Sequence, residues 1–449
     1  MREVNPVFLP PHPIRVMPAL LEGDVTVPGS KSVAHRALIC AALSGDPEWR
    51  TKIRGLDSAP SQDLQVTETI LRQIVEFNSG LGESGRLDSG ESSERPRLSL
   101  DLDCGESGST LRFMIPLLLA SGVSATLNGA GRLPRRPLKE YESIFAEQNV
   151  ELIFPDNGDY LPLDLSGRLR GGRYEVPGHV SSQYLSGLLL ALPLTDEDCQ
   201  IVLTSKLQSR SYVNLTMDVM STFGVEVEYE STAGAYGTYY LAAGQRYQIP
   251  EEGFVVEGDY SQAAFWLAAA FIGAPLKIYG LNPRSKQGDR AVLDILRQLG
   301  AIRTLQQGNL VVDCEDIPDL VPILALTAAT VPGTHRFENC GRLRLKESDR
   351  LNATAEMLIS LGAKCSVNAQ DDSLMVFGMG NYDILEGNTA RRPTASAHGD
   401  HRMAMCLAVA GCCSRHGAVI DQPACVAKSY PDFFEQMVRL GGVFIEEKD

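Results

Sequence analysis

Residues 28–43 read PGSKSVAHRALICAAL, a short Gly/Ser loop with one lysine that runs directly into an Ala- and Leu-rich segment. Apolar residues would cover nearly every face of a helix over 31–43, which indicates a helix buried on all sides. Residues 24–27 before the loop predict a short strand. The GxxxxGK spacing of a Walker-type phosphate loop is absent. The stretch therefore predicts a strand, a tight loop and a buried helix that is polar mainly at its start.

The same pattern of polar loop and apolar helix recurs along the chain. The predicted buried helices cover residues 31–43, 108–120, 181–192, 260–270, 318–329 and 401–410. Predicted strands lie at 24–27, 125–127, 200–204, 276–279, 310–313 and 418–421, and amphipathic helices at 64–77 and 350–361. No strand–GxGxxG–helix unit occurs, so we expect an α/β protein with buried helices and not a doubly wound parallel sheet. The polar stretch 78–97 predicts a mobile surface loop.

Size and composition narrow the possible functions. The 449 residues are enough for two large domains, and the net charge of −15 disfavours binding to nucleic acid or an anionic membrane. The 10 cysteines form no CxxC pair and the 7 histidines form no HExxH pattern, which argues against a metal site. No targeting segment and no apolar run long enough for a membrane span is visible. We expect a cytoplasmic protein with reduced cysteines.

Cations at the starts of the predicted helices indicate a site for a small anion. Helix N-termini carry unpaired N–H groups and partial positive charge, and Lys31, Arg36, Arg112 and Arg402 lie in or near such first turns. Each helix taken singly is equally well an ordinary core helix with a Ser or Asp cap. All of them together, in an acidic chain, favour an anion-binding site.

Further loops concentrate arginine beside carboxylates. Residues 103–112 read DCGESGSTLR and residues 131–137 read GRLPRRP, and the planar arginine fork suits phosphate and carboxylate oxygens. Asp319 and Glu347 lie among cations, which predicts lowered pKa values and carboxylates able to accept a proton. Read alone, residues 346–350 (KESDR) are also typical of a solvated helix start with a salt bridge.

Taken in order, these and other segments resemble the 5-enolpyruvylshikimate-3-phosphate synthase family over essentially the whole chain. The matching segments are PGSKSVAHRA, SQDLQVT, DCGESGSTLR, GRLPRRPL, VSSQYLSGLL, SRSYVNLTM, EGDYSQAAFW, DIPDLVP, LKESDRL, GDHRMAM and KSYPDFF. Each is weak alone, but their order and number make the resemblance specific.

The resemblance implies two groups of binding residues and a catalytic set. The residues implied for shikimate 3-phosphate are Ser32, Arg36, Ser181, Ser182, Gln183, Ser209, Arg210, Tyr212 and Lys346. Those implied for phosphoenolpyruvate are Lys31, Gly108, Arg136, Gln183, Arg350, Arg402 and Lys428. The implied catalytic residues are Lys31, Asp319, Glu347 and Lys428.

The family reaction is an addition followed by an elimination. The 5-hydroxyl of shikimate 3-phosphate loses a proton and attacks C2 of phosphoenolpyruvate while C3 is protonated, and the tetrahedral adduct then loses a C3 proton and phosphate. Asp319 is suited to be the base that accepts the proton of the 5-hydroxyl. Lys31 or Lys428 could protonate C3 and contact the departing phosphate, and Glu347 could accept the C3 proton in the elimination. The resemblance implies no cofactor and no metal, and makes glyphosate a candidate inhibitor. Gly108 predicts sensitivity to glyphosate, weakened by Glu106, which stands where Asn is usual.

The resemblance also implies an inside-out α/β barrel architecture in two domains, each with three βαβαββ-type repeats and buried helices. Residues 1–28 and 258–449 would form the domain for phosphoenolpyruvate and catalysis, and residues 29–257 the domain for shikimate 3-phosphate, in a monomer that closes on its ligands.

Three alternatives remain at this point. The sister family, UDP-N-acetylglucosamine enolpyruvyl transferase, usually has Lys-Asn where this chain has Lys31-Ser32, and a cysteine near the arginine turn, which residues 131–137 lack. RNA 3′-phosphate cyclases share the repeat architecture but need a nucleotide site and a reactive histidine. A non-catalytic relative would retain the fold and lose part of the catalytic set.

Overall fold

The chain divides into two compact units, which we describe separately. The computed structural model describes residues 12–56, 60–84, 99–231, 236–378 and 394–446. Unit 1 comprises residues 1–30, 57–61 and 257–449, and unit 2 comprises residues 31–56 and 62–256. Each unit has its own hydrophobic core, one built from residues 14–27 and 260–444 and the other from residues 33–256.

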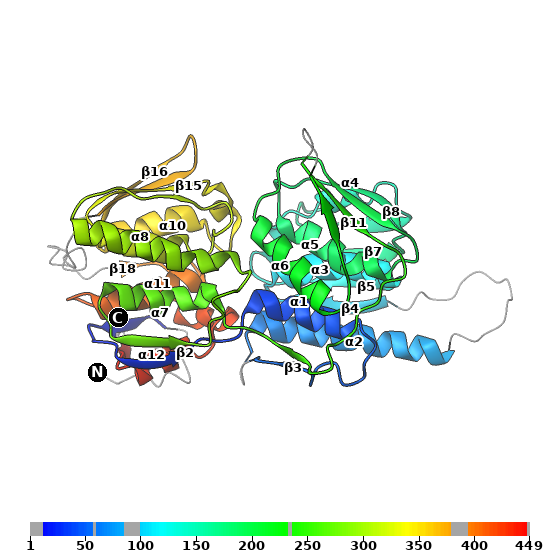
Figure 1. Cartoon of the computed structure of the whole chain (residues 1–449), viewed down its shortest axis with the longest axis horizontal. Helices are drawn as coiled ribbons and strands as arrows, with labels where there is room; N and C mark the ends of the chain where they lie inside the picture. Colours follow the sequence, from blue (N-terminus) through cyan, green and yellow to red (C-terminus); the bar gives the residue numbers. More distant parts are fainter. Residues whose placement is uncertain (1–11, 57–59, 85–98, 232–235, 379–393, 447–449) are drawn as a thin grey trace. The chain divides into compact units, whose positions relative to one another are not determined.

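Unit 1 joins the first strands of the chain to its C-terminal half, so that blue and red segments lie together in Figure 1. Its strands are β1 (Ile14–Met17), β2 (Gly23–Thr26), β13 (Leu276–Tyr279), β14 (Val311–Asp313), β15 (Gly333–Glu338), β16 (Lys364–Asn368), β17 (Ser373–Gly378), β18 (Thr394–Ala395), β19 (Ala418–Ile420) and β20 (Val443–Glu446). Its helices are α7 (Tyr260–Ile272), η3 (Gly288–Ala291), α8 (Val292–Leu305), α9 (Val321–Ala329), η4 (Gly341–Leu345), α10 (Arg350–Ser360), α11 (His401–Cys413), η6 (Pro423–Lys428) and α12 (Phe433–Arg439).

Unit 2 is built in the same style from the middle of the chain. Its strands are β3 (Ile53–Arg54), β4 (Ser99–Asp103), β5 (Ser124–Asn128), β6 (Val150–Ile153), β7 (Leu163–Gly167), β8 (Gly172–Val176), β9 (Cys199–Leu203), β10 (Glu228–Glu230), β11 (Thr238–Leu241) and β12 (Phe254–Val255). Its helices are α1 (Lys31–Ala42), α2 (Gln62–Ser84), α3 (Gly108–Ser121), η1 (Leu133–Arg135), α4 (Glu140–Ile144), α5 (Ser182–Ala191), η2 (Leu192–Leu194) and α6 (Arg210–Thr222).

One strand arrangement recurs in both units. The four-stranded sheets have the orders β14-β15-β17-β16, β18-β19-β1-β20, β4-β5-β7-β6 and β10-β11-β9-β8. Each sheet holds one parallel pair and two antiparallel pairs. Each unit also has one parallel two-stranded sheet, β13-β2 or β12-β3. The described chain is therefore an α/β protein of repeated mixed sheets.

The predicted apolar helices are confirmed as α1, α3, α5, α7, α9 and α11. Most residues of each are buried, because both the sheet-facing and the helix-facing sides are apolar. Side-chain oxygens of Ser107, Ser181, Asp259 and Asp400 cap α3, α5, α7 and α11 by accepting a backbone N–H bond of the first turn. These four polar side chains at the helix starts therefore act as N-caps.

Two predicted boundaries are wrong. Residues 78–84, predicted as loop, continue α2 to Ser84, while residues 85–97 of that predicted loop lie outside the described residues. The helix predicted over 318–329 begins only at Val321, and residues 318–320 form a turn. Pro322 sits in the first turn of α9, where a missing backbone N–H costs nothing. Asp319 is thereby placed before the helix instead of within it.

Glycines allow a close approach where the chain passes from one unit to the other. Gly29 forms an isolated β-bridge with Gly258, and Ser30 N donates to Glu257 O at 2.7 Å. A Cβ atom at Gly258 would overlap the carbonyl oxygen of Gly280, so only glycine fits there. Residues 28–30, next to Lys31, are therefore fixed by backbone contacts within unit 1.

Candidate active site

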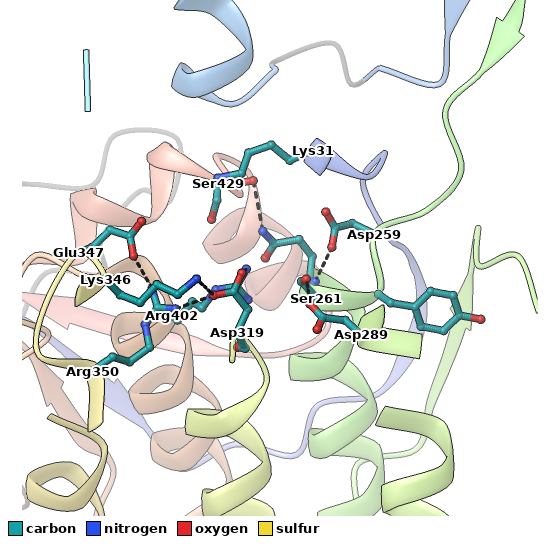
Figure 2. A network of polar contacts seen from close by, with 12 residues as sticks. Lys31, Asp259, Ser261, Asp289, Asp319, Lys346, Glu347, Arg350, Arg402 and Ser429 are labelled. Atoms are coloured by element: carbon teal, nitrogen blue, oxygen red, sulfur yellow. Dashed lines mark hydrogen bonds and ion pairs between the residues drawn. The ribbon is translucent and has the colours of Figure 1, made fainter. Parts of the chain in front are cut away.

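A buried guanidinium, that of Arg350, organises the predicted site residues of unit 1. The side chain is 1% exposed and bonds three carboxylates: Nη1 lies 2.7 Å from Asp319 Oδ1, Nη2 2.6 Å from Glu347 Oε2, and Nε 2.8 Å from Asp400 Oδ2. Figure 2 shows the side chains of Arg350, Asp319 and Glu347 close to one another, together with Lys346 and Arg402. The alternative of a solvated helix start with a surface salt bridge is therefore wrong for Arg350.

Asp319 is the most heavily paired carboxylate of this cluster. Besides Arg350, Lys346 Nζ lies 3.3 Å from Oδ1, and Arg402 Nη2 lies 3.2 Å from Oδ2. Burial by itself would raise the pKa of Asp319, but Arg402, Lys346 and Arg350 hold that pKa well below its usual range. The predicted lowering of its pKa is confirmed, and Asp319 is ionised at neutral pH.

The pKa values of Lys346 and Arg350 shift in opposite directions. Burial lowers the pKa of Lys346, and Asp319 partly restores it. Burial would also lower the pKa of Arg350, but Asp400, Glu347 and Asp319 raise it above its usual value. Lys346 is therefore the cation of the cluster whose proton is held less tightly than usual.

Sequence reasoning missed Asp400, which has a double role. Its side chain is 0% exposed, and its Oδ1 accepts the N–H of Arg402 at 2.9 Å, which caps α11. Its Oδ2 accepts bonds from Arg350 Nε and, at 3.0 Å, from Ser348 Oγ. Burial opposes its ionisation, but Arg350 holds the pKa of Asp400 below its usual value. A carboxylate directly before a largely apolar helix, in the segment GDHRMAM, is the signal that could have identified this cap.

Glu347 and Lys428 are the more accessible members of unit 1. The side chain of Glu347 is 27% exposed, against 1% for its partner Arg350. Lys428 ends η6 and donates from Nζ to Gly399 O at 3.3 Å, next to Asp400 in the sequence. An incoming ligand can reach Glu347 without opening the protein core.

In unit 2, the start of α1 carries two of the predicted cations. Lys31 Nζ forms an ion pair with Asp63 Oδ2 at 2.9 Å, a partner that sequence reasoning did not identify. Arg36 is 3% exposed, and its guanidinium donates to Thr216 Oγ1 at 2.7 Å, to Ser32 O at 2.7 Å and to Tyr212 O at 3.1 Å. Arg36 thus links the start of α1 to α6 from inside the unit.

The predicted turn at 181–183 starts α5. Ser181 caps the helix, Ser182 is buried, and the Gln183 side chain is fixed at both ends. Gln183 Oε1 accepts a bond from Arg112 Nη1 at 3.0 Å, while Nε2 donates to Ser109 Oγ at 2.9 Å. Arg112 also donates to Pro137 O at 3.0 Å, so it ties this amide to the arginine turn.

The third group of residues predicted to bind shikimate 3-phosphate lies at the start of α6, where one residue has an uncommon backbone conformation. Ser209 is buried and takes a left-handed conformation, with φ 53° and ψ 47°. Such a conformation is uncommon for a residue other than glycine and is often found at functional sites. Arg210 is exposed, its guanidinium lies 5.0 Å from the centroid of the Tyr229 ring, and it also donates to the Tyr229 hydroxyl. Tyr212 is half-buried, and its backbone oxygen is the one held by Arg36.

Gly108 and Arg136 meet at the start of α3. A Cβ atom at Gly108 would lie 2.6 Å from Arg136 Nη1, so the absence of a side chain makes room for this guanidinium. Glu106 is exposed, and its carboxylate packs against the backbone of Gly131, where a Cβ atom would be 2.5 Å from Oε2. The acidic residue that departs from the family pattern thus lies at the first residue of the arginine turn.

The described residues contain no group of three His, Cys, Asp or Glu side chains able to hold a metal ion. Within the same described residues, no helix is both long and apolar enough to span a membrane.

Comparisons with known proteins identify the family of the chain. The family model of EPSP synthase (3-phosphoshikimate 1-carboxyvinyltransferase) matches residues 17–437. The chain is 36% identical to the 3-phosphoshikimate 1-carboxyvinyltransferase of Clostridium acetobutylicum, over 96% of this chain and 97% of that protein. It is 38% identical to the Clostridium kluyveri protein of the same name, over 96% and 97% of the two chains.

Solved structures show the same fold. An EPSP synthase from Acinetobacter baumannii matches with a TM-score of 0.69 at 21% identity, covering 97% of this chain and all (100%) of the other. The enolpyruvyl transferase NikO from Streptomyces tendae matches with a TM-score of 0.61 at 16% identity, over 98% and 100% of the two chains. With a family match over residues 17–437 and full-length relatives well above 30% identity, the chain belongs to the EPSP synthase family.

Proposed function

We propose that this chain transfers the enolpyruvyl group of phosphoenolpyruvate to the 5-hydroxyl of shikimate 3-phosphate and releases phosphate, a step of chorismate and aromatic amino acid biosynthesis. The observation that carries the proposal is the Arg350 cluster, in which an ionised carboxylate, Asp319, is held among three cations. The two substrates are inferred from membership of the EPSP synthase family.

Asp319 acts in this scheme as the base for the 5-hydroxyl. Its lowered pKa keeps Asp319 ionised at neutral pH, so its oxygens do not already carry the proton that they must accept, and the 5-hydroxyl becomes more acidic as its oxygen bonds to C2. Lys346, whose pKa is lowered by burial, contacts Asp319 and binds the shikimate ring substituents. Lys31 and Lys428 supply the proton for C3 and the positive charge for the departing phosphate.

The anionic groups of phosphoenolpyruvate bind to Arg136, Arg350, Arg402, Lys428, Lys31, Gly108 and Gln183 in our proposal. Arginine suits this task because its planar donor fork matches carboxylate and phosphate oxygens. Arg350 already holds three carboxylates, of which Glu347 is the most exposed at 27%. A substrate carboxylate therefore reaches Arg350 by displacing Glu347, which frees Glu347 to face the methylene carbon.

The shikimate phosphate and ring bind to polar groups at the starts of α1, α5 and α6 in our proposal. The residues are Ser32, Ser181, Ser182, Gln183, Ser209, Arg210 and Tyr212, joined by Lys346. Helix starts offer N–H groups and partial positive charge to a phosphate. Arg36 serves as a positioning residue, because its guanidinium is 3% exposed and is engaged with Thr216, Ser32 and Tyr212.

We also propose that the two units are the domains of an inside-out α/β barrel architecture, each with three similar repeats. The shared pattern of one parallel and two antiparallel pairs in the four-stranded sheets supports this, as does the two-stranded parallel sheet in each unit. Unit 2 then corresponds to the shikimate 3-phosphate domain and unit 1 to the phosphoenolpyruvate and catalytic domain.

The direct test is phosphate release from phosphoenolpyruvate by the purified chain. Release that depends on shikimate 3-phosphate supports the proposal, and release that depends instead on UDP-N-acetylglucosamine assigns the sister activity. If circular dichroism shows a folded protein and neither acceptor supports phosphate release, the chain is a non-catalytic relative.

Glu347→Gln is expected to lower turnover by about 10²-fold, since an amide cannot accept the C3 proton. In deuterated water, the wild-type protein should exchange deuterium into C3 of phosphoenolpyruvate when shikimate 3-phosphate is present. The variant should lose most of this exchange while retaining its KM for shikimate 3-phosphate. Glu356→Gln, on an exposed side of α10, is the matched control, and equal exchange in both variants would argue against the role of Glu347.

Gly108→Ala is expected to weaken binding of both phosphoenolpyruvate and glyphosate. The new methyl group would lie 2.6 Å from Arg136 Nη1, so the guanidinium must shift away from its present position. Loss of one charge-assisted contact corresponds to about a tenfold rise in the KM for phosphoenolpyruvate. Steady-state kinetics with glyphosate as inhibitor measures both effects, and an unchanged KM together with an unchanged inhibition constant would contradict the prediction.

A further inference from the structure

A second buried carboxylate of unit 1, Asp289 in η3, has no role in the scheme above. Its side chain is 4% exposed, and one oxygen accepts a hydrogen bond from the hydroxyl of Ser261 in the first turn of α7. The other oxygen, Oδ1, is buried without a hydrogen-bond partner among the described residues. A buried carboxylate with one unpartnered oxygen is costly as an anion, so this site favours a carboxyl that retains its proton.

Asp289 lies beside the charges that the proposed reaction uses. Figure 2 shows it beside Ser261, in the same view as Asp319 and Arg402. Asp319, in the turn before α9, and Asp259, the cap of α7, disfavour its negative charge, while Arg402, on α11, and the Ser261 hydroxyl favour it. Burial and Asp319 together raise the pKa of Asp289 to about 7, against the opposing effect of Arg402.

Arg402 forms an ion pair with Asp319 and also acts electrostatically on Asp289. Its Nη2 lies 3.2 Å from Asp319 Oδ2, and its Nη1 donates to Asp319 O at 3.3 Å. Asp319 is ionised throughout the neutral range. Whether Arg402 also faces a second negative charge depends on Asp289.

We infer that Asp289 is a positioning residue of this site: with its proton it leaves the Arg402 guanidinium available to a substrate anion, and without its proton it competes with that anion. The inference rests on the proposed function, in which Arg402 binds phosphoenolpyruvate. Deprotonation of Asp289 adds a negative charge within the electrostatic reach of Arg402, so affinity for an anion falls as pH rises. The proton of Asp289 goes to solvent, and no bond in the substrate changes.

The test is the pH dependence of the KM for phosphoenolpyruvate, measured between about pH 6.5 and 8.5 in wild-type protein and in Asp289→Asn. The variant is neutral at every pH, so the ratio of wild-type KM to variant KM should rise with pH, on the order of tenfold over this range. The substrate ionises in the same way in both measurements, so a change in the ratio with pH reports the ionisation of Asp289. The ratio of wild-type KM to variant KM for shikimate 3-phosphate should stay constant over the same pH range.

Ser261→Ala provides an independent test with a definite direction. Removing the hydroxyl removes a bond that favours ionised Asp289, so the rise in KM should move to higher pH. Asp294→Asn, an exposed carboxylate in α8 that pairs with Arg297, should leave the profile unchanged. If Asp289→Asn does not fold, the pH dependence of the KM for phosphoenolpyruvate in Ser261→Ala tests the role of Asp289.

The outcomes separate this inference from the function on which it rests. A constant KM ratio for Asp289→Asn, or a Ser261→Ala profile that stays in place or moves to lower pH, overturns the role of Asp289 in an active enzyme. A wild-type protein without phosphate release dependent on shikimate 3-phosphate overturns the proposed function instead.

Discussion

Replacing Asp319 by asparagine is expected to lower the turnover number by about two to four powers of ten, the usual contribution of a positioned general base. Asparagine has nearly the shape of aspartate but accepts no proton at neutral pH. It also removes the negative charge shared by Lys346, Arg350 and Arg402. The chemical step should therefore be lost while the outline of the site remains.

Phosphate release at saturating substrates measures this loss, and calorimetric titration with shikimate 3-phosphate shows whether binding survives. Asp313→Asn is the matched control, because Asp313 is an exposed carboxylate at the end of β14, only a few residues earlier in the chain. Near-normal turnover in Asp319→Asn, with intact binding, would remove Asp319 from the base role.

Arg350→Met is expected to destabilise unit 1 by about 3–5 kcal/mol, since removing one partner of a buried ion pair leaves uncompensated charges behind. Three carboxylates, those of Asp319, Glu347 and Asp400, would lose a guanidinium within 2.8 Å. Asp400, at 0% exposure, would be left with no cation beside it in the ion pairs described here. Urea unfolding at neutral pH measures the loss.

The pH dependence of this loss has a definite sign. Arg350 helps to hold the pKa values of Asp319 and Asp400 below their usual values, against the effect of burial. The stability that these carboxylates contribute is present above their unfolded pKa of about 4 and is lost as pH falls through their folded pKa values. The difference between wild-type protein and Arg350→Met should thus be largest at neutral pH and shrink in acid.

Arg297→Met is the matched control for this comparison. Arg297 is 76% exposed and pairs with Asp294 one helical turn away, so its loss should change stability by no more than about 0.5 kcal/mol. Equal stability of the Arg297 and Arg350 variants would contradict the central place given to Arg350.

Much of the fold was predictable because its signal is local. Apolar residues on all sides of 108–120 or 401–410 leave no solvent-facing stripe, so these helices must be buried. The start of α9 was misplaced because proline is allowed in the first turn of a helix as well as in the turn before it. The end of α2 was misplaced because polar residues at 78–84 are compatible with both loop and exposed helix.

Ordered motifs such as DCGESGSTLR and GDHRMAM are read directly along the chain, so the family, the buried helices and most of the candidate site residues could be predicted from the sequence. Which charges meet could not be predicted, because it depends on how distant segments pack. Arg350, Asp319 and Asp400 lie far apart in the sequence, and Asp289, in η3, comes under the electrostatic influence of Asp319 from yet another segment. Burial and the distance between charges set the pKa of each carboxyl group, and both depend on how distant segments pack together.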